Sequence, residues 1–261
     1  MEMLHHPNLL ELHDAFYSPH PQIADMVLNV VTDYMPMNLS ELLAASELTA
    51  QQIAVYALQL ALALNHMHGL AIAHRDVKPQ NILIDPKTQH LRLGDFGSAK
   101  VLEPQASSLS YVCSRHYRAP ELIFGCTTYT TAVDIWSYGC VVAEMVMRTT
   151  IFRGESSADQ LSRIMKVIGS PSPKDVTAMN PRSTQKRIPK VNGLGVRAVL
   201  SLYFTPPLVE DLLEQVFQYD PAARPTALAF AASDFLRDAR KGWPFTAAER
   251  AQAQRAGLVI D

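Results

Sequence analysis

The stretch His74-Arg75-Asp76-Val77-Lys78-Pro79-Gln80-Asn81 decides how the rest of this chain is interpreted, together with Asp95-Phe96-Gly97 a short distance after it. A general-base Asp, a Lys two places on and an Asn three beyond that suit phosphoryl transfer. Asp76 would take the proton of a hydroxyl nucleophile, and Lys78 would neutralise phosphate charge. The closing Asn and the Asp of the second stretch are oxygen donors of the kind that hold Mg²⁺.

Two segments further along the chain strengthen this interpretation. Ala119-Pro120-Glu121 follows the second stretch, and Asp134-Ile135-Trp136 comes after that. A lone His-Arg-Asp tripeptide is common by chance, so a coincidental match in some other α/β fold is the alternative. Four segments in this order argue against that alternative.

The composition is that of an ordinary globular protein. The chain has 261 residues, enough for one large domain or two small ones, and 48% of them are hydrophobic. A net charge of −2 offers no general attraction to nucleic acid or anionic membrane, so we expect neither as a partner. The three cysteines match no zinc spacing, which favours a reducing compartment. We therefore expect the protein in the cytoplasm, with the nucleus as an alternative.

Targeting signals are not expected either. The first residues show no basic region followed by an apolar core, so we expect no signal peptide. The most apolar segments, 53–64 and 135–147, are shorter than a membrane span requires. His66 and His68 lie near the end of a predicted helix, and we interpret them as surface residues rather than metal ligands.

Residue patterns place strands in the first third of the chain. Apolar, β-prone residues predict strands at 9–17 and 26–32, joined by a loop at 19–25 that contains two prolines. Short strands at 82–84 and 91–93 would place Asn81 and the Asp that follows the second strand side by side at the floor of a cleft.

Most of the remaining chain is predicted to be helical. A helix at 49–68 has helical apolar spacing, a capping box of Thr49 and Gln52, and Gly69 as its stop. Thr205 would cap a helix at 206–218 whose first turn contains prolines. Other helices are expected at 38–45, 131–148, 157–168 and, as the last regular one, 226–237. The stretch 170–204 is expected to be irregular, and its basic residues form either a solvated face or a docking patch: Lys186, Arg187 and Lys190.

With these residues in place, the chain resembles the group of Ser/Thr protein kinases that includes the cyclin-dependent, MAP and glycogen synthase kinases, and in particular the glycogen synthase kinase 3 type. The resemblance runs from residue 1 to about 237 and is most specific between 74 and 170. Beside the segments already quoted, it rests on the runs 95–100, 110–125, 134–139 and 151–154.

The resemblance implies an α+β, protein-kinase-like fold. Residues 1–36 would be a remnant of the small lobe, with the end of helix C near residues 3–8, two strands and the hinge. Residues 37–240 would form the mainly α-helical C-terminal lobe, and 241–261 a C-terminal tail. ATP and Mg²⁺ would be the cofactors. The partners would be protein substrates, including pre-phosphorylated ones, and the scaffold partners are left open.

The resemblance also implies roles for individual residues. Asp76 would be the catalytic base, Lys78 would stabilise the transferring phosphoryl group, and Asn81 and Asp95 would hold Mg²⁺. Residues around the nucleotide would be Asp33 and Met35 at the hinge, Gln80, and Leu83 beneath the adenine.

Other implied roles are structural or regulatory. Glu121 would pair with Arg224; the alternative is that these are two unrelated surface charges. Asp134 would orient the His-Arg-Asp backbone; the alternative is an ordinary first-turn helix residue favoured by the helix macrodipole. Arg75 and Lys100 would recognise a substrate phosphate through charge-assisted hydrogen bonds. Tyr111 would be an autophosphorylated tyrosine, with Arg115 and Arg118 as its partners. An unmodified, exposed Tyr111 is the alternative.

The sequence departs from the family pattern at several positions. Thr32 stands at the gatekeeper position in place of Leu, Gly94 stands where a Cys precedes Asp-Phe-Gly, and His116 replaces a Tyr. More importantly, residues 1–74 contain no Lys and no Arg, and Gly69 is the first glycine. A glycine-rich loop and a strand Lys are therefore missing from this stretch. We expect either a kinase sequence truncated at its N-terminus and weak or inactive as it stands, or a catalytically incompetent protein that only binds partners.

Overall fold

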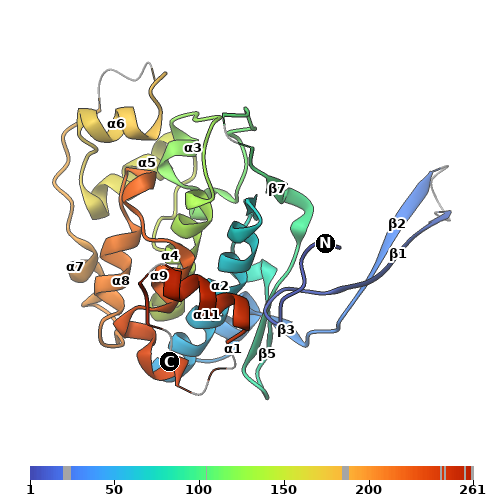
Figure 1. The fold of residues 1–261 in the computed structure, drawn as a ribbon. Helices are drawn as coiled ribbons and strands as arrows, with labels where there is room; N and C mark the ends of the chain where they lie inside the picture. Colours follow the sequence, from blue (N-terminus) through green and yellow to red (C-terminus); the bar gives the residue numbers. More distant parts are fainter. Residues whose placement is uncertain are drawn as a thin grey trace.

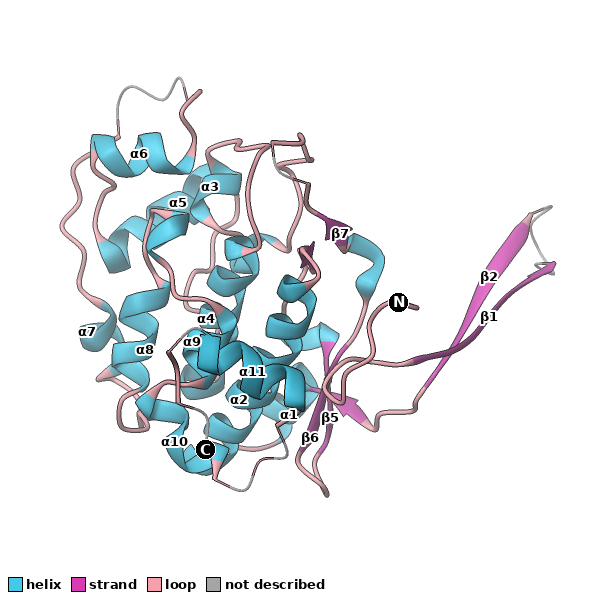
Figure 2. Ribbon diagram, in the orientation of Figure 1, coloured by secondary structure: helices cyan, strands magenta, loops and turns pink. Residues whose placement is uncertain are grey.

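The computed structural model describes residues 1–19, 25–103, 105–183, 188–241, 243, 245–255 and 257–259. A helical body carries short strands at one side, and a two-stranded ribbon projects away from it (Figures 1 and 2). The longer helices are α1 Leu39–Ala45, α2 Ala50–Gly69, α4 Ala132–Met147, α5 Ser157–Ile168, α6 Pro173–Met179, α8 Val209–Val216 and α11 Ala247–Arg255. The shorter ones are α3 Pro120–Ile123, α7 Val196–Leu200, α9 Ala227–Ala231 and α10 Arg237–Arg240. The α+β, helix-rich fold class predicted from the sequence is confirmed.

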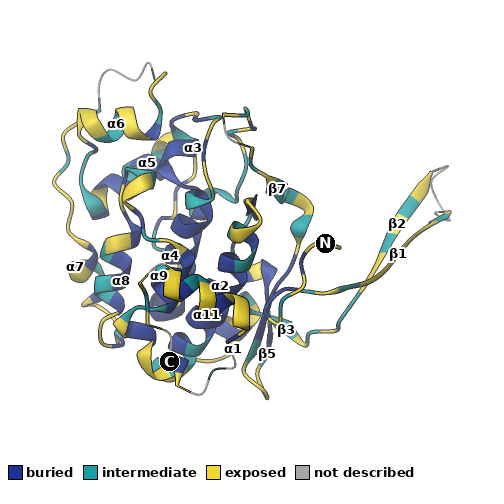
Figure 3. Ribbon diagram, viewed as in Figure 1, coloured by how far each residue is buried: buried dark blue, intermediate teal, exposed yellow. Residues whose placement is uncertain are grey.

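Helices α2 and α4 form the centre of the body. Both are buried on nearly every side (Figure 3), as expected for helices that are apolar nearly all round. The predicted capping box starts α2: the Gln52 amide donates to the Thr49 hydroxyl (3.2 Å), and the Thr49 amide donates to the Gln52 side chain (2.9 Å). On α4, the fully buried Trp136 packs against Phe152 and Phe217, with ring centroids 5.5 and 5.1 Å away.

A small antiparallel sheet borders this core. β5 (Ile82–Asp85) pairs with β6 (His90–Leu93) on one side and with β3 (Met37–Asn38) on the other. A second pair joins β4 (Ile72–Ala73) to β7 (Lys100–Val101). The Gly94 amide donates to the Asn81 carbonyl (2.9 Å). The residues just before β5 and just after β6 are therefore adjacent, as the sequence predicted.

The ribbon consists of β1 (Leu12–Pro19) and β2 (Met26–Thr32), paired in antiparallel register. Its apolar side chains face solvent, with Tyr17 66% and Leu28 51% exposed. The second predicted strand is confirmed, whereas the first starts later than predicted, because Leu9 instead forms a parallel bridge to Leu93 of β6. Residues 20–24 of the predicted hairpin loop lie outside the described residues.

Three predictions about where helices begin or end were wrong. Residues 1–8 contain turns and no helix, so the expected end of a helix there is not found. The helix predicted at 206–218 begins only at Val209, because Pro207 keeps the residue before it out of the helical region and Leu208 has a left-handed φ of 66°. The hydroxyl of Thr205 donates to the Leu200 carbonyl (2.9 Å) and does not cap this helix.

One stretch contains more helix than predicted, and in another the predicted helix is broken. The stretch 170–204 contains α6 and α7, and α6 is started by a capping box of Ser172 and Asp175. The helix predicted at 226–237 is broken into α9 and α10, because Ser233 is extended between them. It is also not the last helix, since α11 follows. In the basic cluster, Lys190 is exposed, and Lys186 and Arg187 lie outside the described residues.

Among the described residues, no helix combines the length and apolar character needed to cross a bilayer.

Candidate active site

The carboxylate of Asp76 is held on both oxygens by three residues from two segments. Oδ2 accepts hydrogen bonds from Nζ of Lys78 (2.7 Å) and Nδ2 of Asn81 (3.1 Å). Oδ1 accepts from the amide and the hydroxyl of Ser114, at 2.9 and 2.8 Å. Nζ of Lys78 also donates to the Ser114 hydroxyl (3.1 Å). The three predicted catalytic residues are therefore brought together, and Ser114 joins them.

The electrostatics of this cluster keep Asp76 ionised. Burial raises the pKa of Asp76, but hydrogen bonds from Lys78 and Ser114 and the charge of Lys78 outweigh it, so its pKa lies below the ordinary value. The result is a carboxylate that is fully charged near neutral pH. The sequence quoted Ser114 within a family segment without giving it a role, and only the fold brings it against Asp76.

Asp134 fixes the backbone of the catalytic stretch from helix α4. Its oxygens accept the amides of His74 and Arg75, both at 2.8 Å. Arg75 has a left-handed φ of 65°, a conformation that a non-glycine residue holds only with support from its surroundings. The predicted orienting contacts of Asp134 are therefore present. His68 adds a third partner, with its Nε2 3.0 Å from the Asp134 carboxylate.

His68 and His66 are not the surface residues that the sequence suggested. Both are half-buried, and the His66 ring lies 5.2 Å from the ring of His6. The polarity of His66 and His68 and their position at a helix end gave no sign of their contacts with His6 and Asp134. His74 is fully buried: its Nδ1 accepts the Asp76 amide (3.2 Å), so its Nε2 carries the proton and donates to the Gly94 carbonyl (2.9 Å).

Asn81 and Asp95 present oxygen atoms suited to a hard cation. Nδ2 of Asn81 donates to the carbonyl and the carboxylate of Asp76, which leaves its carboxamide oxygen for another partner. The exposed Asp95 carboxylate accepts only a long bond from the Gly97 amide (3.3 Å) among the described residues. No cluster of three His, Cys, Asp or Glu suited to a metal occurs in the described part of the chain. This donor set fits Mg²⁺ that is also bound by nucleotide phosphates.

The residues predicted to contact the nucleotide come from the segment after β2, from the turn before β5 and from β5 itself. Leu83 is half-buried, and its side chain lies against Gly94, where an added Cβ would be 3.4 Å from it. Met35 is half-buried, and Asp33 is bound through its carboxylate to Arg92 and to His13 (2.8 Å). Gln80 is exposed and makes a long contact with Ser40 (3.4 Å). The carboxylate of Asp33 is thus occupied by protein groups, so its backbone is the part left to a ligand.

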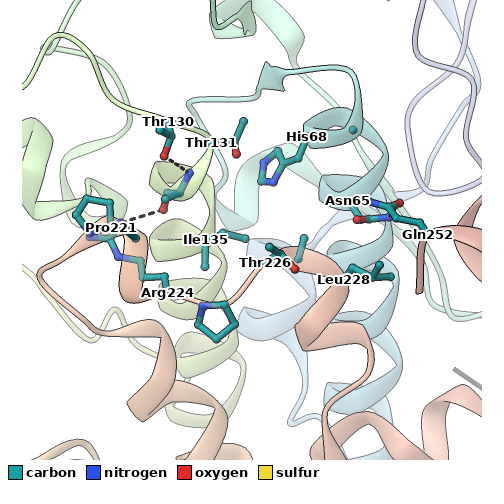
Figure 4. Close-up of a pocket in the computed structure, with 15 residues that line it drawn as sticks. Asn65, His68, Thr130, Thr131, Ile135, Pro221, Arg224, Thr226, Leu228 and Gln252 are labelled. Carbon is teal, nitrogen blue, oxygen red and sulfur yellow. Dashed lines mark hydrogen bonds between the residues drawn. The ribbon is translucent and has the colours of Figure 1, made fainter. Parts of the chain in front are cut away.

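Glu121 and Arg224 form the predicted ion pair. Two parallel bonds of 2.8 and 2.7 Å join the guanidinium to the carboxylate, and both side chains are at most 1% exposed. Arg224 also donates to the Ala132 carbonyl (2.9 Å) at the start of α4, beside a pocket that His68 lines from the other side (Figure 4). The alternative of two unrelated surface charges is wrong, because both groups are buried and share hydrogen bonds.

The two predicted phosphate-binding cations have separate partners within the chain. Arg75 donates to the Ser98 carbonyl (2.6 Å) and the Tyr129 hydroxyl (3.0 Å). Lys100 donates to the Ser108 hydroxyl (2.9 Å). Tyr129 in turn donates to the Leu109 carbonyl (2.9 Å), next to Ser108. Sequence reasoning gave Tyr129 no role, because it lies outside the runs that carry the resemblance and only the fold brings it to Arg75.

Tyr111 and its predicted partners meet only in part. Tyr111 is 74% exposed, and the guanidinium carbon of Arg118 lies 4.5 Å from the centre of its ring. Arg118 also donates to the carbonyls of Val112 and Cys113 (2.9 and 2.8 Å). Arg115 is directed instead to the Glu155 carbonyl (2.6 Å). The tyrosine hydroxyl is accessible, and modification at this position stays a prediction.

Comparison with known proteins identifies the family to which this fold and this site belong. The protein kinase domain family matches residues 1–236. The chain is 41% identical over 239 residues to "Probable serine/threonine-protein kinase glkA" of Dictyostelium discoideum, covering 91% of this chain and 50% of that protein. It is 40% identical over 242 residues to "Serine/threonine-protein kinase RIM11/MSD1" of Saccharomyces cerevisiae, covering 90% of this chain and 65% of that protein.

The chain therefore belongs to the protein kinase family, and it is a protein serine/threonine kinase by family. The resemblance to the glycogen synthase kinase 3 type drawn from the sequence is confirmed. The chain spans between half and about two thirds of the length of these relatives.

Proposed function

We propose that this chain transfers the terminal phosphoryl group of ATP to Ser or Thr hydroxyls of protein substrates, with a low rate for the 261 residues alone. The observation that carries the proposal is the Asp76 carboxylate, ionised and aligned by Lys78, Asn81 and Ser114. A base of this kind is suited to receive a hydroxyl proton, and such catalysis contributes about 10² to 10⁴ in rate.

The proposed roles follow from the contacts. Asp76 orients the acceptor hydroxyl and takes its proton, and Lys78 stands beside it as the cation for the moving phosphoryl group. The carboxamide oxygen of Asn81 and the carboxylate of Asp95 would hold Mg²⁺, which supplies charge neutralisation for the nucleotide phosphates when bound. Leu83 and the backbone around Asp33 would receive the adenine.

The low rate is proposed because residues 1–74 contain no Lys, no Arg and no glycine-rich segment. Kinases normally place such groups over the phosphates, and their turnover is about 1–100 s⁻¹. A single well-placed electrostatic donor contributes about 10² to 10³ in rate. Without two such contributions, from the strand Lys and from the glycine-rich segment, we expect turnover of about 10⁻² s⁻¹ or less from these 261 residues.

The test is a sensitive transfer assay with the purified chain, Mg²⁺, radiolabelled ATP and a pre-phosphorylated Ser/Thr peptide. Slow transfer that disappears in both Asp76→Ala and Asp95→Ala supports the proposal. The unphosphorylated peptide, run in parallel, tests the proposed preference for primed substrates. Label incorporation that is unaffected by either substitution, or no incorporation at all, overturns the proposed chemistry.

A second candidate is a protein that binds partners without catalysis. The observation that favours it is the β1–β2 ribbon, whose exposed apolar residues lie outside the hydrophobic core formed by the described residues. Specific capture of kinase substrates without any Asp76-dependent transfer would support this candidate.

Location and partners complete the proposal. We propose protein substrates, including pre-phosphorylated ones, and a reducing compartment, the cytoplasm or the nucleus. The three cysteines, Cys113, Cys126 and Cys140, are free thiols, which supports that compartment.

A further inference from the structure

Helix α11 carries a buried acid that contacts the beginning of the chain. Oε1 of Glu249 lies 3.2 Å from Nε2 of His6, and these side chains are 7% and 5% exposed. Oε2 of Glu249 accepts the Thr246 amide (2.6 Å) and so closes the capping box that starts the helix. Burial raises the pKa of Glu249, but the hydrogen bonds from His6 and Thr246 outweigh it, so the pKa lies below its ordinary value.

Helix α11 itself buries few residues. The helix Ala247–Arg255 is mostly polar, and its buried residues are Glu249 and Ala253. Phe245 and Leu258, on either side of the helix, pack against the hydrophobic core. Nδ2 of Asn65 on α2 adds one hydrogen bond to Gln252 (3.0 Å). The polar contacts of Glu249 and Gln252 therefore fix the helix between two apolar anchors.

The imidazole of His6 connects Glu249 to the backbone of Asn8. Its Nδ1 accepts the Asn8 amide (3.1 Å), so Nε2 carries the proton and faces Glu249. Asn8 is 1% exposed, and its Nδ2 donates to the Gln59 side chain (2.9 Å) and to the Leu91 carbonyl (3.0 Å).

Residues 8–10 then run beside the end of β6. The Asn8 carbonyl accepts the Leu93 amide (2.8 Å), and the Leu10 amide donates to the Leu93 carbonyl (2.9 Å). The side chain of Leu10 lies against Gly94, where an added Cβ would be 3.3 Å from it. Gly94 immediately precedes Asp95, the candidate magnesium ligand.

We propose that Glu249 is a positioning residue for Asp95, acting from the C-terminal helix through His6 and the 8–10 segment. The series of hydrogen bonds from Glu249 to Leu93 carries the argument, because it joins three segments, α11, residues 6–10 and β6, and each link is buried or half-buried. The role in catalysis rests on the proposed function above. A regulator that displaces α11 would thereby loosen the metal side of the active site.

The test is amide hydrogen exchange by NMR on the full chain without nucleotide. The Leu93 amide is the direct reporter, because its acceptor is the Asn8 carbonyl, and Gly94 reports the contact to Asn81. Glu249→Ala should speed exchange at Leu93 and Gly94 by about tenfold or more, since a buried charge-assisted bond is lost. Amides in α4 should keep wild-type protection.

Three further variants keep the test decisive. Gln254→Ala on the exposed side of the same helix should leave Leu93 unchanged. Glu249→Gln retains the shape and an acceptor for His6, and should give a smaller increase at Leu93. His6→Ala combined with Glu249→Ala should add little to either alone, because the two residues form one link.

Faster exchange in α11 with unchanged Leu93 exchange in Glu249→Ala and Glu249→Gln would overturn the inference, and so would strictly additive effects in the double variant. If Glu249→Ala unfolds the chain as a whole, the Glu249→Gln result decides. These readouts need no phosphoryl transfer, so they can fail while the Asp76-dependent assay succeeds, and the reverse.

Discussion

The helical body and the β1–β2 ribbon use similar apolar residues in opposite ways. Leu62 of α2 is fully buried among the helices, whereas Leu28 of the ribbon is 51% exposed. A two-stranded ribbon is marginally stable by itself, and Figure 3 shows the dark buried residues concentrated in the body. The body therefore provides the stability, and the ribbon depends on its attachment to the body.

The candidate active-site residues are divided between the body and the ribbon in the same way. Asp76 and Asp134 belong to the body and are held by several bonds each. Asp33, just after the ribbon, is held by His13 of β1 and Arg92 of β6. The comparison indicates that the acceptor side of the site is formed in advance by the body. On the nucleotide side, the hinge residue Asp33 depends in part on a contact to the ribbon.

The largest effect is expected from breaking the deepest ion pair of the body. Arg224→Ala leaves the buried Glu121 without its partner, which should lower the free energy of unfolding by about 3–5 kcal/mol. Urea unfolding followed by circular dichroism measures it. Arg197→Ala, which removes an exposed guanidinium paired with acids of α8, is the matched control and should change little. Equal effects of the two substitutions would contradict the assigned burial.

A matched pair of leucines tests the comparison directly. Leu62→Ala opens a cavity in the core and should lower the free energy of unfolding by about 2–5 kcal/mol. Leu28→Ala in the ribbon should change it by no more than about 0.5 kcal/mol. The same urea titrations give both values. A large loss for Leu28→Ala would mean that the ribbon is part of the cooperative core.

Acidification should weaken the body through its buried histidines. Burial lowers the pKa of His66, with further lowering by His6, against an opposing effect of Glu249. Since the folded pKa lies below the unfolded value near 6.5, the unfolded chain takes up the proton first. Stability should therefore be full above about pH 6.5 and should fall as the pH drops through that value. The fully buried His74, whose pKa is also lowered by burial, contributes with the same sign.

Unfolding free energies measured between about pH 7.5 and pH 5.5 check this slope. His66→Gln should flatten part of it and leave the part due to His74. A slope that His66→Gln leaves unchanged would contradict the assigned burial of this imidazole.

The smallest effect is expected at the acceptor site, which consists of the Asp76 carboxylate and its hydrogen-bond donors. Ser114→Ala removes one hydroxyl bond to the Asp76 carboxylate and keeps the amide bond. The pKa of Asp76 should rise toward its ordinary value, with little change in stability. Carboxyl ¹³C NMR titration of the variant beside the wild type measures it. An unchanged pKa would show that the Ser114 hydroxyl does not contribute to the charge state of Asp76.

Sequence reasoning recovered the parts of the molecule that depend on local patterns. The capping box of α2, the buried α4 and the strands around Asn81 and Asp95 follow from periodicity and capping residues. The pairing of Glu121 with Arg224 came from the family resemblance, because no local pattern joins residues so far apart.

Other features could not be predicted because they depend on tertiary contacts. Helix α11 lacks an apolar stripe, and its polar contacts are made with His6 and Asn65 from distant segments. Ser114 acquires its role only when the loop before α3 folds over Asp76. The late start of α8 reflects consecutive prolines and a left-handed Leu208, which outweigh the apolar period that follows.

The claim that the body forms the acceptor site in advance is tested most directly by the ¹³C NMR titration of Asp76 in the wild-type chain without nucleotide, with Asp76→Asn to assign the signal. The account predicts a pKa below the ordinary value of 3.8, so that the carboxylate is still mostly ionised at about pH 4. A pKa at or above 3.8 would contradict it, because the bonds from Lys78 and Ser114 would then not outweigh the effect of burial.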